Sequence, residues 1–205
     1  MQLHKPDVVD AATAILDNYG IADLTMRRLA RELNVSPGAL YWHFANKQEL
    51  LGAVADRILE PVRRDHTASA WPGRIHQIGA ALRDALLSHT DGAELVSSSF
   101  AAGQSQIAGD IVTQLAGAAQ RAGVVSPDDE LAARTVLYYV LGFTADEQSR
   151  LQWDAAGALA DDQSVLHRDT SRQFAFGLQL LVDGLAVRGA STLSAGRDVL
   201  QHRQD

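Results

Sequence analysis

The chain has 205 residues, no cysteine and a formal net charge of −7. The lack of cysteine excludes disulfide bonds and thiolate metal sites. No apolar stretch approaches the ~20 residues needed to span a bilayer, and the first ten residues lack the apolar segment of a secretory signal. The composition therefore predicts a cytoplasmic protein with no membrane segment.

The amino-terminal part of the chain shows the signals of two helices. Pro6 suits the first turn of a helix that Gly20 would end. Apolar residues then recur at helical spacing over 26–33, and Thr25 precedes this run as an N-cap. These two helices are expected to pack with a third into a small head.

The third predicted helix is barely two turns long. Ser36 would cap it and Pro37 suits its first position. It carries Tyr41, Trp42 and His43 in succession. Exposed aromatic residues on so short a helix are unusual in a core, but they suit a surface that contacts DNA. The pattern indicates a helix-turn-helix.

The rest of the chain is also predicted to be helical, with no strand-type alternation. One helix leaves the head and runs to about Arg64, and 71–73 (Trp-Pro-Gly) is expected to break the chain. A loop or frayed helix is expected over 154–167, and a mobile tail after Arg188. The remaining helices are expected at about 74–90, 92–101, 105–122, 127–152 and 169–187. The fold class is therefore all-α.

Two of these stretches, 135–143 and 174–187, are apolar almost all round. Such helices are buried on more than one side. The protein's own body could cover both sides, or each helix could contact a partner subunit with its second face. We expect the second arrangement, a homodimer.

The charge is distributed unevenly along the chain. Residues 1–64 hold eight basic and eight acidic side chains, so the whole −7 lies in 65–205, while 25–47 has a local excess of +3. A basic face on an acidic body disfavours DNA binding in other orientations. The alternative is that the acidic balance serves solubility alone.

The run 35–44 (VSPGALYWHF), followed by 46–51 (NKQELL), resembles the helix-turn-helix of the TetR family of transcriptional repressors. The alternative is a two-helix corner inside an enzyme. The resemblance implies a DNA-binding head at 1–47 and an effector-binding and dimerisation body at 48–205. It also implies a homodimer that joins through its last long helices, binds a palindromic double-stranded DNA operator and is released by a small molecule.

The resemblance also assigns the DNA-binding residues. Arg28 is expected to read a base directly, and the small side chains at 38 and 39 favour thymine-methyl contact and shape over bidentate hydrogen bonds. The positions that match backbone or nearest-base contacts are Thr25, Arg27, Arg28 and Lys47, and those that match the groove-facing positions are Pro37, Gly38, Ala39, Tyr41, Trp42 and His43.

The resemblance extends to 85–93 and 174–178, which match tetracycline-responsive members of the family. Their magnesium-ligating histidine is replaced here by Val96, so no metal is expected at the effector site. We expect an apolar, drug-sized effector. The acidic pair at 146–147 would favour an effector with a positive charge. The alternative is that these are ordinary core residues. The expected lining is Arg63, Ile78, Leu82, Leu86, Val96, Phe100, Gln114, Tyr138, Phe143, Asp146 and Glu147.

The serine-rich segment 97–105 has low helix propensity, and Gly103 can take a positive φ. It is expected to press on the helix that leaves the head and to rearrange when the effector binds; the alternative is a plain flexible loop. No enzyme motif is found: no two histidines are four residues apart, and no G-x-S-x-G occurs. No cofactor is therefore expected. The functional alternative is a helical small-molecule-binding protein or enzyme with a vestigial head.

Overall fold

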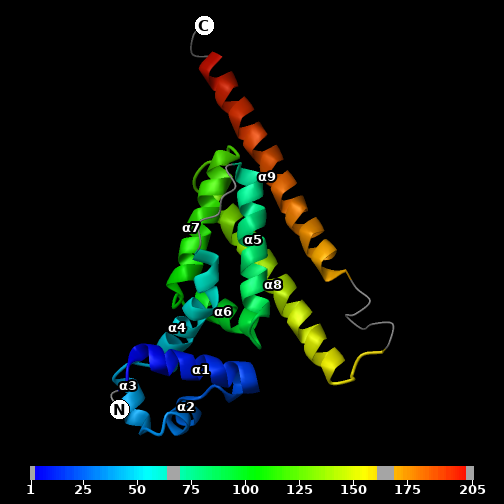
Figure 1. Ribbon diagram of the computed structural model, residues 1–205. Helices are drawn as coiled ribbons and strands as arrows, with labels where there is room; N and C mark the ends of the chain where they lie inside the picture. Colours follow the sequence, from blue (N-terminus) through cyan, green and yellow to red (C-terminus); the bar gives the residue numbers. More distant parts are fainter. Residues whose placement is uncertain (1–2, 64–69, 161–168, 202–205) are drawn as a thin grey trace.

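The computed structural model describes residues 3–63, 70–160 and 169–201, with side chains to residue 191. Throughout these ranges the regular structure is helical, with no strand, as predicted. The head lies at one end, a layered helical body stands on it, and the last helix leans along one side (Figure 1). The elements are α1 (Lys5–Tyr19), η1 (Ile21–Asp23), α2 (Met26–Glu32), α3 (Pro37–Tyr41), α4 (Lys47–Leu59), η2 (Glu60–Arg63), α5 (Trp71–Leu87), α6 (Gly92–Ala101), α7 (Gln106–Arg121), α8 (Asp128–Ala155) and α9 (Thr170–Gln201).

The short helices of the head begin where the sequence predicts, because polar side chains bond their first free N–H groups. The Thr25 hydroxyl accepts from the Arg28 N–H, and the Ser36 hydroxyl accepts from the Ala39 N–H. Asn34 takes a positive φ of 52° in the turn between α2 and α3. The head closes over a core of fully buried side chains, Val8, Ala12, Ile15, Leu16, Leu24, Leu29, Leu40 and Phe44.

A reciprocal cap starts α4, the helix that joins head and body. The Asn46 side chain accepts from the Glu49 N–H, and the Glu49 carboxylate accepts from the Ala45 N–H. This backbone hydrogen bond, followed by the side-chain hydrogen bond from Lys5, holds the pKa of the Glu49 carboxyl below its ordinary value. The cap thus fixes where α4 leaves the head.

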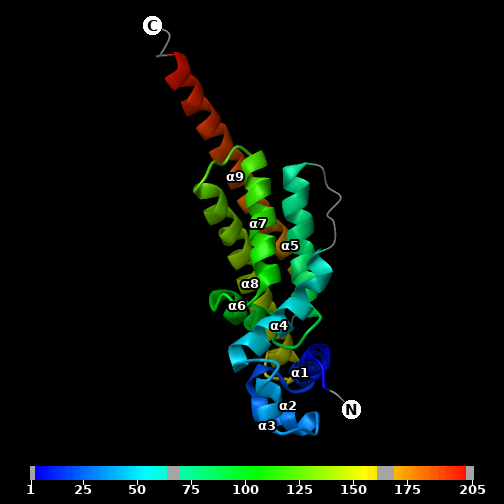
Figure 2. The same cartoon turned by 90° about the vertical axis from the view of Figure 1, so that its left-hand side faces the viewer.

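In the body, α5, α7 and α8 run side by side (Figure 2), and α9 covers one edge against α5 and α8. The second faces of α8 and α9 are left apolar and exposed, at Leu131 and Tyr138 on α8 and at Phe176, Leu180 and Val187 on α9. The two helices are therefore not enclosed by their own body. No helix in the described ranges is long and apolar enough to cross a membrane.

Three boundary predictions are wrong. Residues 71–73 do not break the chain but begin α5, since a proline in a first turn gives up only an N–H with no helical partner. The last helix does not end near residue 187, because α9 continues to Gln201. Helix α4 stops at Leu59 and passes into a 3-10 turn. Arg64, the predicted end of that helix, and 161–167 of the predicted loop lie outside the described residues.

Candidate nucleic-acid interface and regulatory body

The aromatic side chains of the helix-turn-helix divide between core and solvent. Leu40 and Phe44 are buried and anchor the segment, whereas Tyr41 is 52% and Trp42 90% exposed. Pro37 and Gly38 at the start of α3 are exposed. Because hydrophobic burial cannot explain so exposed a tryptophan, the outer face of α3 is a candidate contact surface.

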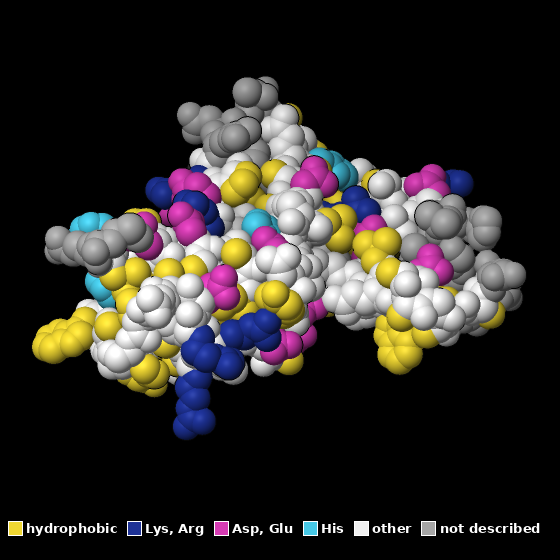
Figure 3. Space-filling view, turned by 60° about the horizontal axis from the view of Figure 1, so that its bottom comes forward, with side chains coloured by type: hydrophobic (Ala, Val, Ile, Leu, Met, Phe, Trp, Pro, Cys, Tyr) yellow, Lys and Arg dark blue, Asp and Glu magenta, His cyan; other side chains and the backbone are white. Residues whose placement is uncertain are grey.

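Basic side chains project from this side of the molecule, and acidic side chains lie beside them (Figure 3). On α2, Arg27 is exposed, and no ion pair involves it within the described ranges. Arg28 instead pairs with the Asp23 carboxylate and lies over the Tyr19 ring, 3.7 Å from its centroid. Its guanidinium is therefore restrained, which weakens the expectation that it reads a base.

The other predicted DNA-binding residues lie beside this face. The Thr25 side chain caps α2, at the head surface. Ala39 and His43 are half-buried on the α3 segment, and Lys47 is half-buried in the first turn of α4. These residues belong to the first turns of α2 and α4 and to the α3 segment.

The predicted effector residues divide between the core and the surface. Ile78, Leu82, Leu86 and Val96 are fully buried in the core. Phe100, Gln114 and Phe143 are half-buried, while Tyr138 is more than half exposed. At the surface, Arg63 pairs with Glu60 and Asp146 with Arg150.

Glu147 is buried in an ion pair that the sequence did not reveal. The Arg83 guanidinium donates two hydrogen bonds to its carboxylate, at 2.8 and 2.6 Å, and lies 5.2 Å from the Phe174 ring centroid. Next to it, the Tyr139 hydroxyl donates to the Phe174 carbonyl, and burial raises the pKa of this phenol. Since Arg83 neutralises Glu147, this carboxylate no longer supports the prediction of a cationic effector.

Two hydroxyls in this region are buried without a hydrogen-bond partner among the described residues: Ser99 Oγ and Thr144 Oγ1. Ser99 lies one turn after Val96 on α6, and Thr144 follows Phe143 on α8. A buried hydroxyl without a partner costs about 1–3 kcal/mol. No group of three or more metal-ligating side chains is found in the described part of the chain.

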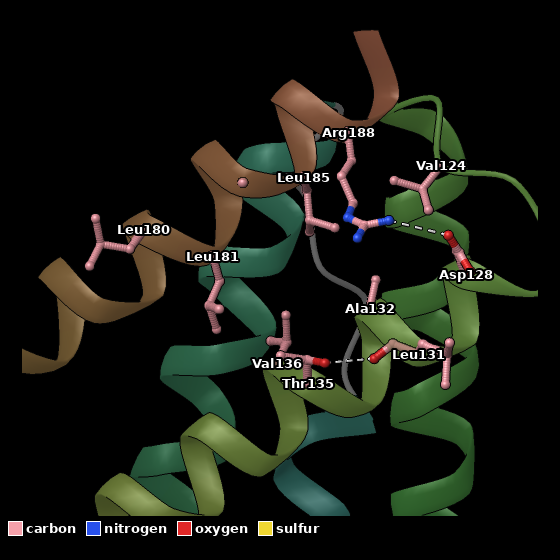
Figure 4. A pocket seen from close by; sticks show the side chains of 11 residues that line it. Val124, Asp128, Leu131, Ala132, Thr135, Val136, Leu180, Leu181, Leu185 and Arg188 are labelled. Atoms are coloured by element: carbon pink, nitrogen blue, oxygen red, sulfur yellow. Dashed lines mark hydrogen bonds and ion pairs between the residues drawn. The ribbon is translucent and has the colours of Figure 1, made fainter. Parts of the chain in front are cut away.

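An apolar cavity of about 430 Å³ lies elsewhere, between α8 and the middle of α9 (Figure 4). Leucines from both helices line it, and the Arg188–Asp128 ion pair (3.3 Å) closes one end. The cavity is continuous with the exposed apolar faces of the two helices, through Leu131 and Leu180.

The end of α6 rests on α4, as the sequence predicts. Gly103 takes a φ of +66°. A Cβ added at Gly52 would lie 2.3 Å from the Gln104 carbonyl oxygen. Asp56 of α4 also accepts hydrogen bonds from the Ser105 hydroxyl (2.7 Å) and the Ile107 N–H (3.1 Å). The α6–α7 turn is therefore fastened to the helix that carries the head.

This combination of a capped helix-turn-helix with an exposed recognition face, joined by one helix to a helical body, defines a DNA-binding regulator. The family profile described as "Bacterial regulatory proteins, tetR family" matches residues 8–54. A second profile, "Tetracyclin repressor-like, C-terminal domain", matches residues 65–166.

Relatives agree over nearly the whole chain. Tetracycline repressor protein class E of Escherichia coli is 30% identical over 91% of this chain and 92% of its own. The crystal structure of Mycobacterium smegmatis BioQ is 70% identical, with a TM-score of 0.86 over 92% of this chain and all of that one. BioQ with its natural double-stranded DNA operator is 67% identical, with a TM-score of 0.80 over 90% of this chain and 99% of that one.

The protein belongs to the TetR family. It is a ligand-responsive, DNA-binding transcriptional regulator. Members of this family are regulators rather than enzymes.

Proposed function

We propose that the protein is a cytoplasmic repressor whose α3 face enters the major groove of a palindromic operator. Tyr41 and Trp42 supply apolar contact area there, beside Pro37, Gly38, Ala39 and His43. Thr25, Arg27, Arg28 and Lys47 contact the flanking phosphates or nearest bases. The observation that carries the proposal is the 90% exposure of Trp42, which directly follows α3 and lies between the buried Leu40 and Phe44.

A gel shift with the DNA upstream of the protein's own gene tests this proposal. The Trp42→Ala variant should lose operator binding, and Trp153→Ala is the matched control because Trp153 is also exposed (60%) but lies near the end of α8, in the body. Equal binding by both variants would contradict the groove contact. If the wild type binds no DNA, a helical small-molecule-binding protein with a vestigial head becomes the better description.

The proposal also divides the chain into two units. We propose residues 1–47 as the DNA-binding unit and 48–205 as the effector and dimerisation unit. The exposed apolar faces of α8 and α9 support a dimer contact there, because a second copy would bury Leu131, Phe176 and Leu180 and cover the cavity between the helices. One symmetric dimer then places two heads on one operator.

For the effector we propose a small apolar molecule that enters the core between α5, α6 and α8 without a metal ion. Ile78, Leu82 and Val96 are closely packed there, so the ligand must separate these side chains as it binds. The orphan hydroxyls of Ser99 and Thr144 support this location, because a polar group on the ligand would give them partners.

A thermal-shift screen of small molecules tests the effector proposal, because a ligand that binds only the native state raises its apparent stability. A hit should keep its shift in the presence of a chelator and release the operator in a gel shift. The Thr144→Val variant should lose the shift while keeping operator binding. Binding that disappears with the chelator would refute the metal-free site.

A further inference from the structure

The head touches the body at a second place besides α4. The turn between α5 and α6 lies against the end of α1, which crosses the base of the body (Figure 1). In this turn Asp91 takes a positive φ of 53°. Its Oδ2 accepts a hydrogen bond from the Ile21 N–H at 2.9 Å, and its Oδ1 accepts from Gln152 Nε2 of α8 at 2.6 Å. One carboxylate therefore bridges the head and α8.

The turn that carries Asp91 is itself held by α8. The buried Gln148 side chain donates to the Leu86 carbonyl (3.0 Å) and the His89 carbonyl (2.8 Å) and accepts from the Ala93 N–H (3.0 Å). These three bonds fix both ends of the turn. Motion of α8 is thus passed to Asp91 rather than absorbed by the turn.

On the other side, the end of α1 makes two further bonds to the same turn. His89 Nδ1 lies 3.0 Å from the Asp17 carboxylate, and the Thr90 hydroxyl donates to the Asp17 carbonyl at 2.9 Å. The approach at Gly20 is close, since a Cβ there would lie 2.7 Å from Asp91 Oδ2. The contact is therefore built from several bonds along one edge of the head.

We propose that Asp91 is a positioning residue for operator recognition: it holds the head at a fixed angle to α8 and so sets the spacing of operator half-sites that the dimer accepts. A head attached through α4 alone could pivot about that helix. The second attachment, on the other side of the head, removes this rotation. The exposed apolar face of α8 belongs to the proposed dimer interface. Each head is then held at a fixed angle to that interface, and the two recognition helices stay about 34–36 Å apart.

The proposal rests on the proposed DNA face, so the test separates the two. The operator is first selected from random duplex DNA by the wild-type protein. Affinity is then measured for that operator, for versions whose central spacer is one or two base pairs longer or shorter, and for a duplex with a single half-site. The half-site reports on the DNA face of one head, whereas only the spacer series reports on head orientation.

Asp91→Gly removes both bonds without backbone strain, because glycine accepts a positive φ, and the Asp91 side chain makes no capping bond to α6. Gln152→Ala breaks only the bond to α8. Arg150→Ala is the control on the same helix, since Arg150 pairs with the exposed Asp146. A thermal melt of each variant establishes folding.

We expect Asp91→Gly to bind the selected operator about tenfold more weakly, because a head that is no longer held must be ordered when both half-sites are bound, and a tenfold loss corresponds to about 1.4 kcal/mol. The variant should bind operators with altered spacers almost as tightly as it binds the selected operator. Its affinity for the single half-site should stay at the wild-type value. Gln152→Ala should show the same flattening to a smaller degree, and Arg150→Ala none. A wild-type spacer profile in Asp91→Gly would overturn the proposal; if that variant does not fold, a wild-type profile in Gln152→Ala would do so. Failure of the wild type to select any DNA would refute the DNA face instead.

Discussion

The contact between α4 and the α6–α7 turn can be tested by adding one methyl group. In Gly52→Ala the new Cβ would lie 2.3 Å from the Gln104 carbonyl oxygen and 2.8 Å from Gln104 Cβ. Ordinary contacts begin at 3.4 Å, so α4 and the turn must separate by about 1 Å. The nearest atom belongs to the backbone, which means that no side-chain rotation can relieve the clash.

The matched control is Gly109→Ala on α7, where an added Cβ has nothing within 4 Å. Both changes replace glycine by alanine inside a helix, which favours the helix by up to about 1 kcal/mol. Overpacking should cost the Gly52 variant about 1–3 kcal/mol in addition. Chemical denaturation should therefore give a free energy of unfolding lower in Gly52→Ala than in Gly109→Ala by that amount.

Operator binding should separate the two variants as well. If ~1.4 kcal/mol of the strain is relieved when α4 tilts away from the turn, and DNA binding restores the strain, the operator affinity of Gly52→Ala falls about tenfold. Gly109→Ala should bind like the wild type. A Gly52→Ala protein as stable as Gly109→Ala, with unchanged operator affinity, would refute the tight coupling between α4 and this turn.

Other consequences follow from the charged groups. Glu147→Ala leaves Arg83 buried without its partner and should lower the free energy of unfolding by about 3–5 kcal/mol, whereas Asp146→Asn at the surface should change it by less than about 1 kcal/mol; equal effects would contradict the burial argument. Lys47→Ala should weaken binding to all operator sequences alike and lower the slope of log affinity against log salt by about 1; a changed base preference with an unchanged slope would rule out a phosphate contact. The lowered pKa of Glu49 means that its stabilisation is present above the ordinary value of 4.5 and is lost as the pH falls through the folded-state pKa. In Glu49→Gln the free energy of unfolding should therefore decrease less on acidification than in the wild type. The same decrease in both proteins, measured by denaturation at several pH values, would refute this.

The helix-turn-helix and the all-α class could be predicted from the amino-acid sequence alone. The caps at Thr25 and Ser36 bond backbone groups only three residues away, so short-range chemistry was enough to predict where α2 and α3 begin. The exposure of the aromatic pair at 41–42 could also be predicted from the local sequence, because so short a helix has too few buried positions for both side chains. The prediction of a chain break at Pro72 was wrong, because a proline can either end a helix or occupy its first turn.

The roles of most polar groups, by contrast, depend on contacts between segments that are distant in the sequence. Arg83 and Glu147 are 64 residues apart, and Ile21 and Asp91 are 70 apart. Nothing in the local pattern distinguishes Glu147, which is buried and neutralised, from its neighbour Asp146, which is exposed. Likewise the periodicity showed that α8 and α9 were apolar all round but not which face stays uncovered. Local sequence sets the conformation of a segment through bonds within one turn, whereas the partner and the solvation of a side chain depend on which distant segments the fold brings beside it.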